Sequence, residues 1–217
     1  MTDKSCKLAI LISGSGSNLQ AFIDATKSGQ LDADIALVVS NKPGVKGLER
    51  ARQAGIETAV VEHKKYASRE EFDQALVDTL TEYAVDLVIL AGFMRILTSV
   101  FIQPFAGKLM NIHPSLLPKY PGLDTHQRAI DAGDTLAGAT VHFVTEELDG
   151  GPPIIQAQIA LTKNDSVQSL AARVLRAEHK IYPQAAQWFA QKKLQLKGGK
   201  VYIDNEPIAD TGRVFED

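Results

Sequence analysis

The chain has 217 residues, with 23 basic and 26 acidic side chains and a formal net charge of −3. Apolar residues make up 45% and charged residues 23% of the sequence, which excludes a disordered or collagen-like chain. The small excess of acid argues against a dedicated nucleic-acid-binding protein, since these usually have a basic face. The single cysteine, Cys6, cannot form an internal disulfide, and the apolar run at residues 8–12 is too short to span a membrane. We therefore expect a soluble, cytoplasmic globular protein.

The first half of the chain alternates short apolar runs with amphipathic stretches. The apolar runs lie at residues 7–13, 35–39, 57–61 and 86–90. They predict buried strands, because strands covered on both faces lose the polar alternation. A helix is expected near Leu19, and Ser68 with Glu71 forms the capping-box pattern of another helix. This order predicts a Rossmann-like α/β fold, an open, mostly parallel twisted sheet with helices on both faces.

The second half of the chain has a less regular pattern. Further strands are expected at residues 108–112, 138–145 and 153–161. Three prolines between residues 114 and 121 predict a loop. Asp165 and Gln168 are expected to cap a long helix, which Pro183 should kink or end. The Gly-Gly pair at residues 198–199 predicts a small hairpin, and the tail after Ile203 is polar and expected to be peripheral.

A glycine-rich loop follows the first expected strand and leads into a helix. Backbone N–H groups and the helix dipole favour an anion at such a place. A dinucleotide-binding loop would have a third glycine where this chain has Leu19, and an acid near residues 40–42, which read Ser-Asn-Lys. The loop therefore favours a single phosphate over NAD, held by Gly16, Ser17 and Asn18. A tight turn without a ligand is the alternative.

Asn111, His113 and Asp149 form the candidate catalytic group. Asn111 and His113 lie two residues apart in an expected strand, so their side chains share one side of it. Asp149 is expected to end another strand at a glycine-rich turn, from which it could reach the same crevice. A carboxylate near an imidazole raises the pKa of the histidine, which suits a general acid. Each residue alone has a structural alternative, as a cap, a buried histidine or a turn residue.

Four stretches of sequence carry a resemblance to a known family. They read ISGSGSNLQ at residues 12–20, AGFMRIL at 91–97, NIHPSLLPKYPG at 111–122 and GATVHFVTEELDGG at 138–151. In these stretches and in their order the chain resembles the folate-dependent formyltransferases. The resemblance implies transfer of a formyl group from 10-formyltetrahydrofolate, the co-substrate, to the amino group of glycinamide ribonucleotide in de novo purine biosynthesis, without a metal.

The resemblance also implies a role for each catalytic residue. The substrate amine attacks the formyl carbon directly, so no protein nucleophile is needed. Asn111 would stabilise the developing oxyanion. His113, as an imidazolium, would stabilise the same charge and help pass a proton to the departing folate nitrogen. Asp149 would keep His113 charged, either directly or through an ordered water.

Binding positions follow from the same resemblance. It places the ribonucleotide on Gly16, Ser17 and Asn18 and on Leu175, Arg176, Ala177 and Glu178. It places the folate on Arg69, Met94, Arg95, Ile96, Leu97, Asn111, Thr145, Glu146, Glu147, Leu148 and Asp149. Glu178 lies four residues after Val174 on the apolar stripe of the long helix, where a charge needs a partner. The alternative for Glu178 is a glutamate at the helix edge that forms a salt bridge. The alternative for the apolar residues among 94–97 is that they are ordinary core residues.

One position departs from the family pattern. Many relatives have histidine at position 124, where this chain has Asp124. A carboxylate there would alter the charge near the catalytic residues, so Asp124 is left out of the expected catalytic group.

Three other functions compete with this interpretation. Formyltetrahydrofolate deformylases use a similar trio but usually carry an extra N-terminal domain, and methionyl-tRNA formyltransferases usually add a C-terminal tRNA-binding barrel. A phosphate-binding module without activity would leave the trio unexplained. We expect a transferase of residues 1–217 in one domain, with a phosphate-binding half at about 7–105, a catalytic and folate-binding half at about 106–190, and a hairpin and tail at 191–217. It would act on its two substrates, without nucleic acid or membrane, as a monomer or homodimer.

Overall fold

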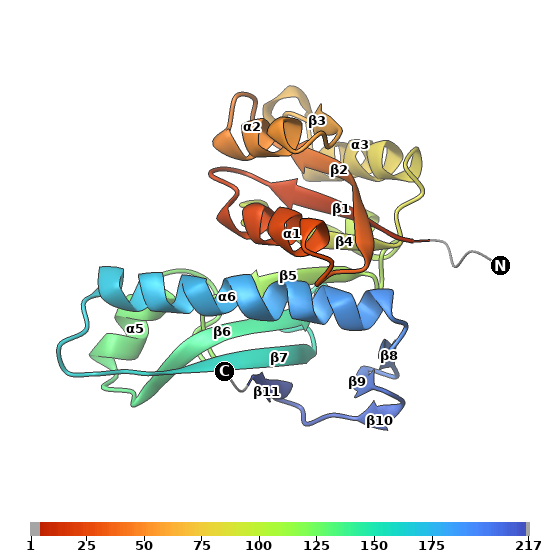
Figure 1. Ribbon diagram of the computed structural model, residues 1–217. Helices are drawn as coiled ribbons and strands as arrows, with labels where there is room; N and C mark the ends of the chain where they lie inside the picture. The colour runs from red at the N-terminus through yellow and green to blue at the C-terminus, as the bar shows by residue number, and fades with distance from the viewer. Residues whose placement is uncertain (1–4, 216–217) are drawn as a thin grey trace. The chain divides into compact units, whose positions relative to one another are not determined.

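The computed structural model describes residues 5–215 (Figure 1). They cluster into two compact units, of which the first ends at Asn111 and the second begins at Ile112. The strands of the first unit are β1 (Cys6–Ile12), β2 (Ala33–Ser40), β3 (Thr58–Val60), β4 (Leu87–Leu90) and β5 (Leu109–His113), whose last residues cross into the second. Its helices are α1 (Ser17–Lys27), α2 (Lys46–Gln53), α3 (Arg69–Thr81) and α4 (Ser99–Ile102), with a 3₁₀ turn, η1, at His63–Lys65.

The strands of the first unit pair in parallel in the order β3-β2-β1-β4-β5. Residues 8–12 of β1 are wholly buried, as expected for a strand covered on both faces. Right-handed crossovers place α1 and α2, which contact each other, on one face, and α3, which contacts α4, on the other. The loops after β1, β2 and β4 therefore meet at the carboxyl edge of the sheet, where ligands bind in such folds.

The second unit is built on an antiparallel pair and one long helix. Its elements are α5 (Thr125–Asp131), β6 (Leu136–Phe143), β7 (Pro153–Ala160), α6 (Val167–Ala190), β8 (Leu194–Lys197), β9 (Lys200–Ile203), β10 (Glu206–Pro207) and β11 (Arg213–Phe215). β6 and β7 pair in antiparallel fashion, and α6 packs along both strands (Figure 1). The described strands thus pair mostly in parallel, and the predicted α/β class is confirmed.

The expected cap of the long helix is wrong, and of the two outcomes expected at Pro183, a kink or an end, the end is excluded. Ser166, not Asp165, is the N-cap: its hydroxyl accepts from the Ser169 N–H, and the Ser169 hydroxyl accepts from the Ser166 N–H. Pro183 does not end α6, which continues to Ala190. A proline inside a helix costs about 3 kcal/mol. Pro183 is buried beside Tyr182, which is also fully enclosed, so the packing of this face offsets the lost hydrogen bond.

The C-terminal segment contains one expected and one unexpected feature. β8 and β9 form the predicted hairpin, and its two turn glycines both have positive φ, 56° at Gly198 and 77° at Gly199. Such values are those of a type I′ turn. The tail after Ile203 was expected to be peripheral, but β11 pairs in parallel with β7 and extends the sheet of the second unit. The alternation in this tail is too short to be recognised as a strand.

The close pairing of β6 and β7 leads to a stability prediction at Gly138. A Cβ atom at this position would collide with the backbone carbonyl of Ala157 on the neighbouring strand and approach Leu116 Cδ2 to 2.7 Å. We expect Gly138→Ala to lower the free energy of unfolding by about 2 kcal/mol or more, because an overpacked site forces the backbone apart. Urea denaturation measures the change. Gly14→Ala, where a Cβ meets nothing within 4 Å, is the matched control, and equal effects in both variants would contradict the packing argument.

Candidate active site

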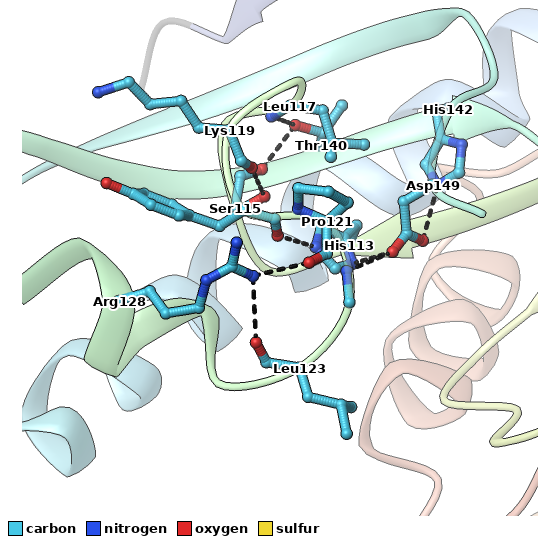
Figure 2. Close-up of polar contacts among 12 residues, drawn as sticks. His113, Ser115, Leu117, Lys119, Pro121, Leu123, Arg128, Thr140, His142 and Asp149 are labelled. Atoms are coloured by element: carbon cyan, nitrogen blue, oxygen red, sulfur yellow. Dashed lines mark hydrogen bonds and ion pairs between the residues drawn. The ribbon is translucent and has the colours of Figure 1, made fainter. Parts of the chain in front are cut away.

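His113 lies at the end of β5 and is enclosed by hydrogen-bond acceptors on both sides. Its Nε2 is 2.8 Å from the Tyr120 carbonyl oxygen, and its Nδ1 is 3.4 Å from Oδ2 of Asp149 (Figure 2). The side chain is only 7% exposed. A doubly protonated ring donates to both acceptors, whereas a neutral ring turns a lone pair toward one of them. Both nitrogens of the His113 ring therefore face an oxygen acceptor.

Asp149 lies in the loop between β6 and β7, not at the end of a strand as expected, because β6 stops at Phe143. Its φ is 52°, a left-handed conformation that aspartate tolerates better than most residues. The carboxylate is 8% exposed, and Oδ2 accepts a 2.9 Å hydrogen bond from the Gly122 N–H. Oδ1 is 3.9 Å from His142 Nε2. Asp149 is thus a buried carboxylate placed beside two imidazoles.

Asn111 precedes His113 by two residues in β5, with Ile112 between them. Strand alternation puts the Asn111 and His113 side chains on the same side of β5. Ile112 is buried, and Asn111 is half-buried. An amide and an imidazole therefore leave the same side of one strand, as the sequence predicts.

The proline-rich loop after His113 is bonded firmly to the sheet of the second unit. The Thr140 hydroxyl on β6 donates to the Ser115 carbonyl at 2.6 Å and accepts from the Leu117 N–H at 3.0 Å. Gln156 on β7 donates to the Leu117 carbonyl at 2.7 Å. The Ser115 hydroxyl donates to the Lys119 carbonyl at 2.6 Å. These bonds fix the loop that presents the Tyr120 carbonyl to His113 (Figure 2).

The glycine loop of the first unit is held in one shape by close backbone packing. Gly16 is the N-cap of α1 with φ 70°, and a Cβ on it would lie 2.8 Å from Gly47 Cα. The Gly47 N–H donates to the Gly14 carbonyl at 3.0 Å, and Arg50 Nε donates to the Ser15 carbonyl at 2.9 Å. The next two residues, Ser17 and Asn18, open a helix with no acid in its first turn. The arrangement suits an anion.

The segment after β4 carries the expected folate-contacting residues 94–97. Met94 and Ile96 are 68% and 57% exposed, whereas Leu97 is buried at 8%. The core interpretation thus holds for Leu97 and is wrong for Met94 and Ile96. Arg95 is half-buried, and Arg69 is exposed at the start of α3. Met94 and Ile96 thus present two apolar side chains to solvent in one short segment.

Both ends of this segment are anchored by hydrogen bonds. The Met94 N–H donates to the Ser13 hydroxyl at 2.8 Å, and that hydroxyl donates to Asn41 Oδ1 at 2.7 Å. At the other end, Oδ2 of the buried Asp73 accepts from the Thr98 N–H and hydroxyl at 2.6 and 2.7 Å. Ser13 precedes the glycine loop, so one hydroxyl links that loop to the segment at 94–97.

The remaining expected site residues lie in the second unit. On α6, Leu175 is half-buried, Arg176 is exposed and Ala177 is buried. Glu178 is only 7% exposed, so it lies on the buried face of α6 and not at the helix edge. In the loop after β6, Thr145 is half-buried and Glu146, Glu147 and Leu148 are exposed. Asp124 is exposed at the start of α5, where its φ is 56°.

A family model described as formyl transferase matches residues 6–186. The chain belongs to this family. It is 50% identical over 210 residues to phosphoribosylglycinamide formyltransferase of Haemophilus influenzae, covering 97% of this chain and 99% of that protein. It is 48% identical over 199 residues to the human trifunctional purine biosynthetic protein adenosine-3, covering 91% of this chain and 20% of that longer protein. The solved phosphoribosylglycinamide formyltransferase of Coxiella burnetii superposes with a TM-score of 0.95 at 44% identity, covering 98% of this chain and all of that one.

Within residues 5–215, no group of three or more His, Cys, Asp or Glu side chains is placed to hold a metal ion. The same residues include no helix with the length and apolar character needed to cross a membrane.

Three residues near the candidate sites were not singled out from the sequence. Burial lowers the pKa of His142 to about 4, so this ring is neutral at pH 7 although Asp149 is near. Burial, assisted by His113, also lowers the pKa of His126. Arg50 brings a cation to the glycine loop. For His142 the sequence did offer a signal, because it lies between Val141 and Phe143 in an expected buried strand. A polar side chain buried there needs a hydrogen-bond partner.

Asp73 gives a prediction about pH. Burial is the main cause that raises the pKa of its carboxyl, and the Thr98 bonds oppose it. Asp73→Asn keeps an oxygen acceptor for Thr98 and removes the buried charge. The stability of Asp73→Asn relative to wild type should therefore rise as pH increases from about 4 through the raised pKa toward 7. Asp73→Ala should lose about 2 kcal/mol, because the Thr98 N–H is left without its acceptor. Urea denaturation at both pH values tests this, and equal behaviour of the two variants would refute it.

His142 gives a second pH prediction of the opposite sign. A histidine whose pKa is lowered on folding stabilises the folded state above pH 6.5, and this contribution is lost as pH falls toward 4. The loss amounts to about 3 kcal/mol for this residue alone. His142→Asn, whose Nδ2 can replace the Nδ1 donor to the Phe143 carbonyl, should unfold with a shallower dependence on pH over this range. Parallel curves for wild type and variant would show that His142 is not the titrating group.

Proposed function

We propose that this chain is a phosphoribosylglycinamide formyltransferase, which transfers a formyl group from 10-formyltetrahydrofolate to the amino group of glycinamide ribonucleotide in de novo purine biosynthesis. Relatives with that name match it over nearly their whole length. The structural observation that carries the proposal is the buried pair of His113 and Asp149, with both imidazole nitrogens facing acceptors.

The proposed chemistry is direct acyl transfer. The glycyl amine attacks the formyl carbon, and the carbonyl oxygen becomes an oxyanion in the tetrahedral intermediate. His113, held as an imidazolium by Asp149, lies at the end of β5 to stabilise that charge, and the amide of Asn111 donates to the same oxygen. The C–N bond to the folate then breaks. The amine loses one proton and the folate nitrogen gains one, so the reaction is balanced without a nucleophile or metal.

The binding assignments are part of this proposal. The backbone N–H groups of residues 16–18 would take the ribonucleotide phosphate, with Arg50 adding a cation beside the loop. The exposed Met94 and Ile96 would cover one side of the folate ring system, and the segment at 145–149 would bond to its polar edge. Arg69 would meet a tail carboxylate. Glu178 would recognise the ribose hydroxyls or the glycyl amine. Its carboxylate is buried, which fits this role.

We also propose that residues 1–217 act as one formyltransferase domain in the cytoplasm. The family match at residues 6–186 extends across both compact units, which supports a single functional domain with two lobes. The structural boundary after Asn111 lies close to the expected division at about residue 105. Cys6 is a free thiol, as is usual in a reducing compartment.

An assay with purified protein tests the reaction. We expect folate product from 10-formyltetrahydrofolate only when glycinamide ribonucleotide is present. His113→Ala and Asp149→Asn should each lower kcat by about 100-fold or more, because the charge that stabilises the oxyanion is lost or misplaced. Asp131→Asn, an exposed carboxyl on α5, is the matched control. Turnover without the ribonucleotide would favour a hydrolase, and no turnover with either mixture would refute the enzyme proposal.

A further inference from the structure

Arg128 on α5 bonds to the turn that faces the catalytic pair. One of its terminal nitrogens, Nη1, donates to the Pro121 carbonyl at 2.7 Å and to the Leu123 carbonyl at 3.3 Å (Figure 2). Its guanidinium also lies over the Tyr120 ring, 5.0 Å from the centroid. An arginine on a solvent-exposed helix usually contributes little. Here one side chain contacts three residues of the same turn, Tyr120, Pro121 and Leu123.

The Pro121 carbonyl and the Gly122 N–H belong to one peptide group. Its oxygen accepts from Arg128 at 2.7 Å, and its N–H donates to Asp149 Oδ2 at 2.9 Å. A cation thus lies at the oxygen end of the peptide dipole and an anion at the nitrogen end. Both bonds are charge-assisted, and each strengthens the other by polarising the peptide between them.

The turn at Pro121–Gly122 has an alternative conformation that would break this arrangement. A proline followed by a glycine with φ 81° matches the central pair of a type II turn. A type I turn differs by rotation of the central peptide through roughly 180°. That rotation would turn the Gly122 N–H away from Asp149 and direct a carbonyl oxygen toward the carboxylate. The orientation of this peptide therefore decides whether Asp149 Oδ2 has a donor.

We propose that Arg128 is a positioning residue, which fixes the Pro121–Gly122 peptide and through it holds the Asp149 carboxylate beside His113. Oδ2 of Asp149 is the oxygen that both accepts from Gly122 and faces His113 Nδ1. The Tyr120 ring under Arg128 belongs to the residue whose carbonyl accepts from His113 Nε2. The hydroxyl of the same Tyr120 ring donates to Oδ2 of Asp134 at 2.9 Å. Arg128 thus acts on both acceptors of the imidazole, although it touches neither His113 nor Asp149.

The catalytic part of this inference rests on the proposed function, but the structural part has its own readout. In protein labelled with ¹⁵N-glycine, the Gly122 amide proton should resonate downfield because it bonds to a carboxylate. In Arg128→Ala this proton should move upfield in the same direction as in Asp149→Asn. Gln127→Ala, a change at the neighbouring exposed residue of α5, should leave it unmoved.

The kinetic prediction is a selective effect on turnover. Arg128→Ala should lower kcat by about tenfold to a hundredfold with both KM values nearly unchanged, because the reacting groups are misplaced and substrate contacts are kept. Arg128→Lys, which keeps a charge but not the planar stack on Tyr120, should lie between Arg128→Ala and wild type. An unmoved Gly122 resonance in Arg128→Ala would overturn the proposal whatever happens to kcat. If the wild-type protein is active, a moved Gly122 resonance together with an unchanged kcat in Arg128→Ala would also overturn it. Wild-type protein without turnover would refute the proposed function, while the resonance would still test the role of Arg128 in holding Asp149.

Discussion

One carboxylate oxygen organises the candidate site of this protein. Oδ2 of Asp149 accepts the Gly122 N–H and faces Nδ1 of His113, so the strand that carries the imidazole, the turn after it and the loop between β6 and β7 meet at a single atom. A buried carboxylate is unfavourable unless donors surround it. The need to satisfy Asp149 therefore constrains the backbone of two loops, in which Tyr120, Gly122 and Asp149 all have positive φ.

The two histidines beside Asp149 lie in different surroundings. His113 has an oxygen acceptor facing each ring nitrogen. His142 is buried and bonds to the carbonyl of Phe143, and desolvation keeps it neutral despite the nearby carboxylate. Asp149 thus faces one imidazole with an acceptor at each nitrogen and one that burial keeps neutral.

Much of the fold could be predicted from the sequence, because it depends on local apolar runs and caps. Residues 8–12 and 87–90 are buried strands, and the Ser68 cap and the hairpin at 198–199 lie where short-range chemistry puts them. Strand β11 was not predicted, and the sequence left open whether Pro183 kinks or ends the helix, because both depend on tertiary packing that a local rule does not include. Of the candidate site, the closeness of His113 and Asp149 followed from the family pattern. The position of Asp149 within a loop and the neutral state of His142 did not, since both depend on burial by residues distant in sequence.

The pairing of β11 with β7 has a consequence for synthesis on the ribosome. β7 is bordered by β6 on one side, and among the described residues its other edge pairs with 213–215 alone. While the chain is being made, that edge stays open until α6 and the hairpin of β8 and β9 have been completed. An open strand edge can pair with another nascent chain. The last described strand therefore closes the outer edge of β7 only after the rest of the described second unit has been synthesised.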